Sequence, residues 1–240
     1  ATSTNLASLS AQLVGGDTVT AATLAYTNKN AASGSKVVTT SSASISDGNS
    51  GDNYIISYAN NTTSTIHKAE LAIQAVTDTK TYDGTVASNK TVEVFNASGS
   101  SDVVTVAQEF ASKNALGLNA STLQLTSGYT IKDTGGTDMS GNYNVTTQTA
   151  MGTINKKDVT LDSITAANKT FNGNDAATIT AGSISTGVGT ETLLVSGSGT
   201  FSDKNAGINK VVTVADVTAL SKTNGTGDWG NYNLTTTGAM

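Results

Sequence analysis

The chain of 240 residues has a formal net charge of −5, with thirteen lysines and no arginine. Because phosphate groups are usually bound by guanidinium forks on a basic face, we do not expect nucleic acid as a partner. The chain has no cysteine, which excludes disulfides and thiol nucleophiles, and no apolar run of about 18 residues that could span a membrane.

Serine and threonine account for 69 of the 240 residues, and only 5% of the residues are aromatic. So polar a composition could indicate disorder. The apolar residues nevertheless alternate with polar ones, for example in 103–106 and 211–214, and valine and threonine favour strands. We therefore predict an all-β chain.

The chain repeats itself, and the repeats divide it into three copies. Asn142-Tyr143 recurs 89 residues later as Asn231-Tyr232, and Asn53-Tyr54 precedes it by the same interval. A repeat of this length is a whole small domain copied in tandem. We predict three modules: residues 1–67, incomplete at the N-terminus, then 68–155 and 156–240.

Each complete module consists of short strands and tight turns in the sequence pattern. It opens with an alternating segment and continues to a triplet, Tyr82-Asp83-Gly84 or Phe171-Asn172-Gly173, that favours a turn with positive φ. Residues 107–116 could instead hold one turn of helix. We expect the aromatic residues of these motifs to anchor the cores. The predicted strands are 36–38, 70–76, 91–95, 103–110, 121–125, 158–164, 192–201 and 210–212.

No glycine-, serine- or proline-rich linker separates the copies. The last strand of one module is expected to run directly into the first strand of the next, which predicts an elongated, fairly stiff rod. Each module should be a small β-sandwich or a β-grasp-like sheet, and the sequence leaves both open.

Three motifs recur in a fixed order: Lys-Thr-Tyr-Asp-Gly, an aromatic residue followed by Lys-Asn-Ala, and Gly-Asn-Tyr. Together they resemble the tandem YDG or MBG-type modules of large exported bacterial adhesins, similar to filamentous haemagglutinin and the high-molecular-weight adhesins of two-partner secretion. The third copy departs from the pattern with Phe171-Asn172, and the second lacks Lys-Val-Val. The matching residues are 29–31, 36–38, 53–54, 80–84, 113–115, 141–143, 169–173, 204–212 and 230–232.

The resemblance implies a secreted segment at the bacterial cell surface, associated with the outer membrane. The expected function is attachment to host cells, through a cell-surface glycan or glycoprotein, in virulence. The alternative is a passive structural stalk that projects a separate binding domain. Neither function requires a cofactor.

The chain contains nine Asn-x-Ser/Thr sequons, against about six expected by chance from its composition. Adhesins similar to the high-molecular-weight family can carry hexoses on such asparagines, so the resemblance makes these residues possible glycosylation sites. They are Asn60, Asn61, Asn89, Asn96, Asn119, Asn144, Asn168, Asn224 and Asn233.

Catalytic groups are scarce. The only histidine, His67, occupies a place that Asn155 fills in the next copy, so a general-base role is not expected. The acids Glu70, Glu93 and Glu191 are scattered like strand-surface residues, and we predict no enzyme activity. Loop aspartates such as Asp47 could bind Ca²⁺, but no copy has the D-x-D-x-D-G spacing, and solvated turn residues are the favoured interpretation. We predict no metal site.

The only tryptophan, Trp229, stands in a polar loop next to Asp228 and Asn231. An aromatic face beside fixed hydrogen-bonding groups is a common way to bind a sugar. We therefore name Trp229, Asp228 and Asn231 as a candidate glycan site. The alternative is a tryptophan that folds back over a neighbouring strand or a domain junction.

Overall fold

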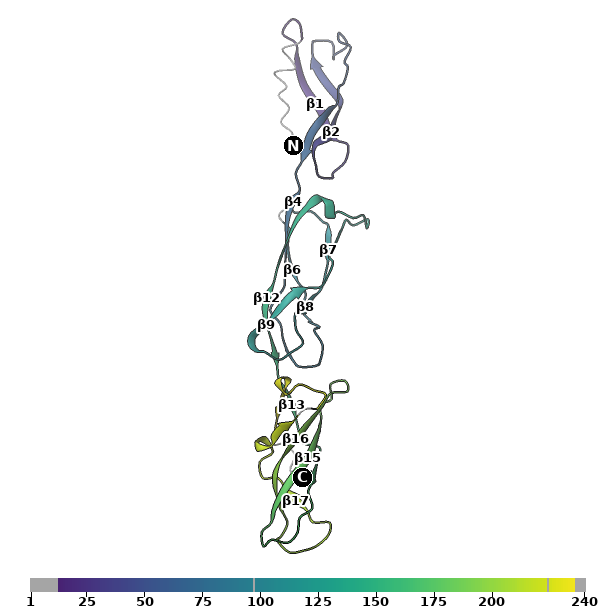
Figure 1. The fold of residues 1–240 in the computed structure, drawn as a ribbon. Coiled ribbons are helices and arrows are strands. Elements are labelled where there is room, and N and C mark those ends of the chain that lie inside the picture. The colour runs from purple at the N-terminus through teal and green to yellow at the C-terminus, as the bar shows by residue number, and fades with distance from the viewer. Residues whose placement is uncertain (1–12, 97, 224, 236–240) are drawn as a thin grey trace. The chain divides into compact units, whose positions relative to one another are not determined.

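The computed structural model describes residues 13–96, 98–223 and 225–235 (Figure 1). These residues form β-strands connected by loops and three short 3-10 turns, so the prediction of an all-β chain is confirmed. The chain divides into two compact units. Unit 1 takes the described residues of Ala1–Ala72, Val94–Thr105 and Tyr129–Thr146, and unit 2 those of Ile73–Glu93, Val106–Gly128 and Thr147–Met240.

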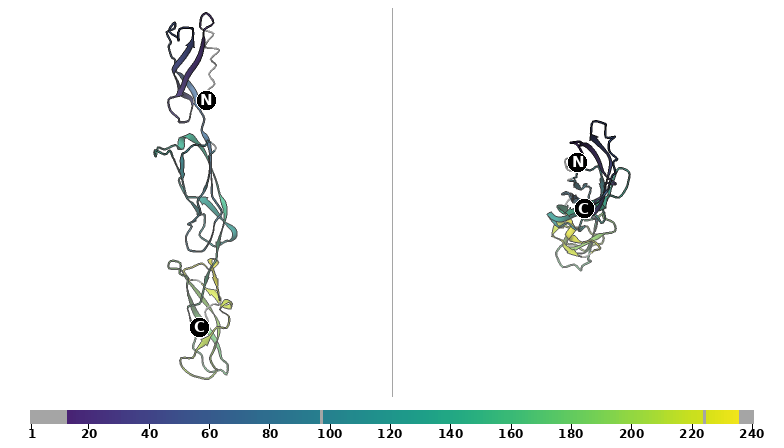
Figure 2. Two further views of the ribbon diagram at one scale, coloured as in Figure 1. Left: turned by 180° about the vertical axis from the view of Figure 1, so that it is seen from behind. Right: turned by 90° about the horizontal axis from the view of Figure 1, so that it is seen from above.

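Unit 1 begins with a long antiparallel ribbon of β1 (Thr18–Tyr26) and β2 (Ala32–Ser46), to which β3 (Asn61–Ile66) adds a third strand (Figures 1 and 2). A second pair joins β7 (Val103–Thr105) to β10 (Thr130–Lys132). The strands β4 (Ala69–Gln74), β6 (Glu93–Asn96) and β11 (Tyr143–Gln148) form a sheet in the order β11-β4-β6, and the 3-10 turn η1 (Ser140–Asn142) leads into β11.

Unit 2 contains a four-stranded sheet in the order β5-β12-β9-β8, in which the central strand is the last in sequence. β12 (Ala150–Asn155) runs parallel to β5 (Thr79–Thr81) and antiparallel to β9 (Gly117–Leu125), and β9 pairs with β8 (Gln108–Phe110). The predicted turn of helix at 107–116 is therefore wrong, because its first residues extend as β8 against β9.

The rest of unit 2 is built on a long hairpin. β15 (Ala176–Ser185) pairs with β16 (Thr192–Phe201), and their apolar residues alternate between the buried and the exposed face. The 3-10 turns η2 (Val217–Ala219) and η3 (Trp229–Asn231) lie in its loops. Further strands are β14 (Ser163–Ala166) and β17 (Val212–Thr213) at the ends of this sheet, β18 (Ser221–Thr223) on β16, and the parallel pair β13 (Lys157–Val159) and β19 (Tyr232–Leu234).

The buried apolar residues of unit 2 form one continuous cluster. It includes Phe110, Leu123 and Ile154 from the four-stranded sheet and Leu193 and Tyr232 from the hairpin side of the unit. Both sides therefore exclude water together, and burial of this size is the main stabilising contribution to the unit.

The aromatic residues of the motifs anchor the core with one clear exception. Tyr82, Phe110, Tyr143 and Tyr232 are all buried, as predicted, whereas Phe171 is 61% exposed. Phe171 is the counterpart of Tyr82, so the same motif position is buried in one copy and open in the next.

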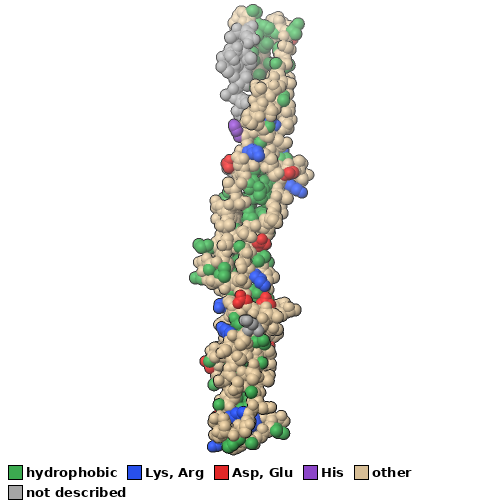
Figure 3. Space-filling model, viewed as in Figure 1, with side chains coloured by type: hydrophobic (Ala, Val, Ile, Leu, Met, Phe, Trp, Pro, Cys, Tyr) green, Lys and Arg blue, Asp and Glu red, His purple; other side chains and the backbone are tan. Residues whose placement is uncertain are grey.

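The surface is polar but carries few charges. On the face drawn in Figure 3, uncharged polar side chains and backbone cover most of the area, and lysine and acidic side chains stand apart from one another. None of the helices in the described part of the chain is long and apolar enough to cross a membrane.

Candidate functional site

The side chain of Asn231 joins two segments of unit 2 that are 116 residues apart. Its Oδ1 accepts a hydrogen bond from the backbone N–H of Ala115 (2.8 Å), and its Nδ2 donates to Oδ1 of Asn114 (3.2 Å). Asn231 is 2% exposed and closes the short turn η3. Because the amide is donor and acceptor at once, it fixes one arrangement of the two segments.

Two tyrosines next to this contact share one carboxylate. Tyr82 donates from its hydroxyl to Oε1 of Glu191 (2.9 Å), and Tyr232 donates to Oε2 (2.7 Å). Their rings meet edge to face, with centroids 5.3 Å apart. Lys113 lies 3.5 Å from Oε1, so the carboxylate has three partners. Residues Tyr82, Lys113, Asn114, Ala115, Glu191, Asn231 and Tyr232 are called the unit 2 junction below.

The hydrogen bonds of the junction decide its protonation states. Burial alone would raise the pKa of Glu191, but the bonds from Tyr232 and Tyr82 and the charge of Lys113 outweigh it and hold the pKa below the ordinary value. Burial and the bond to Glu191 raise the pKa of both tyrosines. At neutral pH the site is therefore an ionised carboxylate held by two neutral phenols.

Each residue of the Tyr82-Asp83-Gly84 triplet has a distinct role beside the junction. Asp83 accepts hydrogen bonds from the backbone N–H of Thr85 and from Nζ of Lys80, both at 2.9 Å, which close the turn. Gly84 has φ +78°, and a Cβ there would lie 2.7 Å from Cγ1 of Val188. A side chain at position 84 would therefore meet both backbone strain and a packed neighbour.

Unit 1 contains the same asparagine contact. Oδ1 of Asn142 accepts from the backbone N–H of Ala31 (2.7 Å), and its Nδ2 donates to Oδ1 of Asn30 (3.3 Å). Beside it, Nζ of Lys29 lies 3.1 Å from Oδ2 of Asp133. Residues Lys29, Asn30, Ala31, Asp133 and Asn142 are called the unit 1 junction.

The tyrosine after each asparagine also donates to a carboxylate in all three copies. Tyr54 donates to Oδ2 of Asp17 and Tyr143 to Oδ2 of Asp102, both over 2.7 Å, as Tyr232 does to Glu191. Sequence reasoning missed these acids. A signal was present, because Asp102 and Glu191 lie 89 residues apart, the interval that separates their tyrosines.

The comparison with family models matches the YDG domain twice, at residues 67–150 and 155–239. The chain belongs to the YDG domain family. No curated protein and no solved structure matches it. The unit 2 junction therefore brings together side chains from two successive YDG domains, with Tyr82 from the first match and Glu191 from the second.

The residues named for a glycan site lie in the second YDG domain, where the structure gives them separate partners. Trp229 is half-buried against the core cluster, and its Nε1 donates to the backbone oxygen of Thr223 (3.1 Å). Nζ of Lys222 lies 5.0 Å from the centre of the indole ring. Asp228 is exposed and caps η3, while Asn231 is engaged in the junction. A glycan site at this loop stays a prediction.

The predicted glycosylation sites differ in exposure. Asn96 is half-buried and Asn224 lies outside the described residues. Asn144 and Asn233, which are equivalent in the two YDG domains, donate to the equivalent acids Glu70 and Asp158. Their modification stays a prediction. The exposed sites are Asn60, Asn61, Asn89, Asn119, Asn144, Asn168 and Asn233.

The loop aspartates form local turns. Asp47, Asp133, Asp138 and Asp228 each accept a backbone N–H two residues ahead, the geometry of an Asx-turn. Over 13–96, 98–223 and 225–235, no group of three or more His, Asp or Glu is arranged to hold a metal ion.

Proposed function

We propose that this chain is a connecting segment of a surface-exposed, secreted bacterial adhesin, in which the junctions hold consecutive copies in a defined arrangement. The observation that carries the proposal is the repetition of one asparagine contact in both units. A chain whose role is to project another domain needs such a specific connection at every step. Of the two functions implied by the resemblance, this observation favours the stalk.

The path of the backbone supports the same function. β12 ends at Asn155 and β13 begins at Lys157, so no flexible linker separates the two YDG domains in unit 2. The apolar cluster of unit 2 also contains residues of both domains. A bend at this point would expose apolar surface and break the bonds to Glu191, so the junction resists bending.

Attachment to a host glycan or glycoprotein is the second candidate. The observation that favours it is the exposed carboxylate of Asp228 beside the half-buried indole of Trp229. In this version of the proposal the loop itself binds a sugar, and the junctions only present it.

Spin labels on the two sides of the unit 2 junction test the connector function. The chain has no cysteine, so the exposed residues Leu118 and Thr178 can be replaced by labelled cysteines without side reactions. We expect a narrow distance distribution in the otherwise unchanged chain and a broad one after Asn231→Ala. Distributions equally broad in both would contradict the proposal.

A glycan array probed with the same chain tests the second candidate. The connector function predicts no binding. Binding that is lost in Trp229→Ala, with the distance distribution unchanged, would instead favour attachment through the Trp229 loop.

A further inference from the structure

The first two copies carry a strand in the same sheet position. In unit 1, β3 pairs with β2, and in unit 2, β12 pairs with β9. β12 is also covered on its other edge by β5, and Ile154 within it is fully buried. The strand therefore completes the sheet of its domain.

The second YDG domain has the neighbours of this strand but, among its described residues, not the strand itself. Phe110 pairs with Leu123 at the β8–β9 contact, and Phe201 pairs with Val212 at the β16–β17 contact, so β17 is the counterpart of β9. β9 has nine residues and β17 only two. The counterpart of β5, residues 168–170, is not in a strand.

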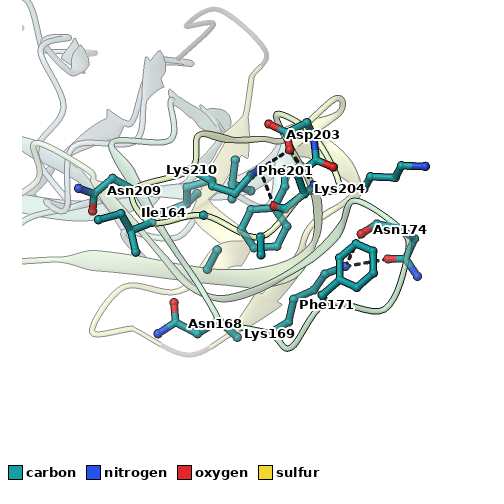
Figure 4. A pocket seen from close by; sticks show the side chains of 17 residues that line it. Ile164, Asn168, Lys169, Phe171, Asn174, Phe201, Asp203, Lys204, Asn209 and Lys210 are labelled. Atoms are coloured by element: carbon teal, nitrogen blue, oxygen red, sulfur yellow. Dashed lines mark hydrogen bonds and ion pairs between the residues drawn. The ribbon is translucent and has the colours of Figure 1, made fainter.

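A groove of about 720 Å³ lies between these two segments (Figure 4). Its lining includes Ile164, Asn168, Lys169, Phe201 and Val212. The apolar part is the counterpart of the surface that β12 covers, because Phe201 and Val212 correspond to Phe110 and Leu123. Nearby Ile208 is 90% exposed and Val211 66% exposed, as expected of a sheet edge without its neighbour.

The shape of the occupant follows from β12. A Cβ on Gly152 would lie 2.8 Å from Cδ1 of Leu123 and 2.8 Å from Cε1 of Phe110, so a strand here needs glycine at that position. The backbone N–H of Thr153 donates to the carbonyl of Asp78, and that of Tyr82 donates to the carbonyl of Asn155, both over 2.9 Å. The counterparts of Asp78 and Tyr82 are Ala167 and Phe171, and both line the groove.

We infer that the groove is a strand-binding site, which takes an extended peptide with the pattern of Ala150–Asn155. The peptide would lie between residues 168–170, in parallel, and residues 210–212, antiparallel, in the manner of β-strand addition. The occupant is a YDG-domain strand that is not engaged elsewhere. A second copy of this chain does not provide one, because its own β12 would have to leave an identical site.

A peptide of residues 149–156 added to the 240-residue chain tests the inference. We expect saturable NMR shifts at residues 168–170 and 210–212. The matched control is the same peptide with Gly152→Val, which places a side chain against Phe201 and Val212 and should leave the spectrum unchanged. Equal shifts with both peptides would overturn the inference, since they would show non-specific adhesion.

A covalent version gives a high effective concentration and decides the case of weak binding. Appending Gly-Thr-Ile-Asn after Met240 repeats Ala150–Asn155 in the third copy. We expect the melting temperature to rise by roughly 5 °C or more and the amides of 210–212 to be protected from hydrogen exchange. No rise, or the same rise when valine replaces the appended glycine, would overturn the inference. Light scattering on the unextended chain checks strand exchange, and a dimer would contradict the stated occupant.

Discussion

In both units an asparagine binds an Asn-Ala segment through the same two hydrogen bonds, but the surroundings of the two contacts differ. In unit 2, Glu191 accepts hydrogen bonds from Tyr82 and Tyr232, whose rings pack edge to face within the apolar cluster. In unit 1, the neighbouring charged contact is between Lys29, which is 66% exposed, and Asp133. The shared asparagine contact is thus one component of the junction, and the surroundings are another.

The difference teaches what the Tyr-Asp-Gly triplet adds. Tyr82 supplies the second phenol on Glu191, and Gly84 permits the close approach of Val188. Asp102, the counterpart of Glu191, bonds Tyr143 in its own copy. We therefore expect substitutions in the unit 2 junction to cost more stability than their counterparts elsewhere.

The largest effect is expected for Gly84→Ala, with Gly173→Ala as its matched control. Both glycines have positive φ, but a Cβ at 84 meets Val188 at 2.7 Å, whereas a Cβ at 173 has nothing within 4 Å. Gly84→Ala should lower the free energy of unfolding by about 2–4 kcal/mol and Gly173→Ala by about 1 kcal/mol. Urea denaturation followed by Trp229 fluorescence measures both. Equal losses would mean that the contact with Val188 is unimportant, and the Gly84→Ala, Val188→Ala double variant should recover part of the loss.

The next effect is the loss of the shared carboxylate in Glu191→Gln. A glutamine keeps the shape but turns one acceptor into a donor that faces a tyrosine hydroxyl, so we expect a loss of about 2 kcal/mol at pH 7. The counterpart Asp102→Asn removes an acceptor that has one tyrosine partner and should cost about 1 kcal/mol. Denaturation curves in which Asp102→Asn is the more damaging would reverse the comparison.

Acid should remove the difference between the wild-type chain and Glu191→Gln. Because the folded-state pKa of Glu191 lies below its ordinary value of 4.5, the ionised form stabilises the folded chain above that pH. The contribution is lost as the pH falls from 4.5 through the lower folded-state pKa. We expect the two stabilities to converge in this window, measured by urea denaturation at a series of pH values. A constant difference down to pH 3, an order-of-magnitude endpoint well below 4.5, would contradict the assignment.

The strands could be predicted from the sequence, because alternating valine and threonine reflect local structure. The junction could not, since its contacts join residues about 110 positions apart. Asn231 was named for a glycan because it neighbours Trp229, yet its partners are Asn114 and Ala115. Burial of an aromatic at the motif position likewise depends on the next copy, as the contrast between Tyr82 and Phe171 shows.

Removal of the asparagine side chain should affect the two units to a similar extent. Asn231→Ala and Asn142→Ala each delete one acceptor and one donor, and each leaves a backbone N–H without its partner. We expect losses of about 1–2 kcal/mol in both. Hydrogen exchange of the amides of Ala31 and Ala115 gives a local reading for each unit. Faster exchange at Ala115 alone would show that the contact in unit 1 contributes little.

The smallest effect is expected for the lysines. Lys29 and Lys113 are 66% and 49% exposed, so water and salt screen their attraction to Asp133 and Glu191. Lys29→Ala and Lys113→Ala should leave the melting temperature unchanged within error, and so should raising the salt from about 0.05 to about 0.5 M. A salt-dependent loss in Lys113→Ala alone would mean that the third partner of Glu191 matters, and that charge as well as the two phenols distinguishes the unit 2 junction.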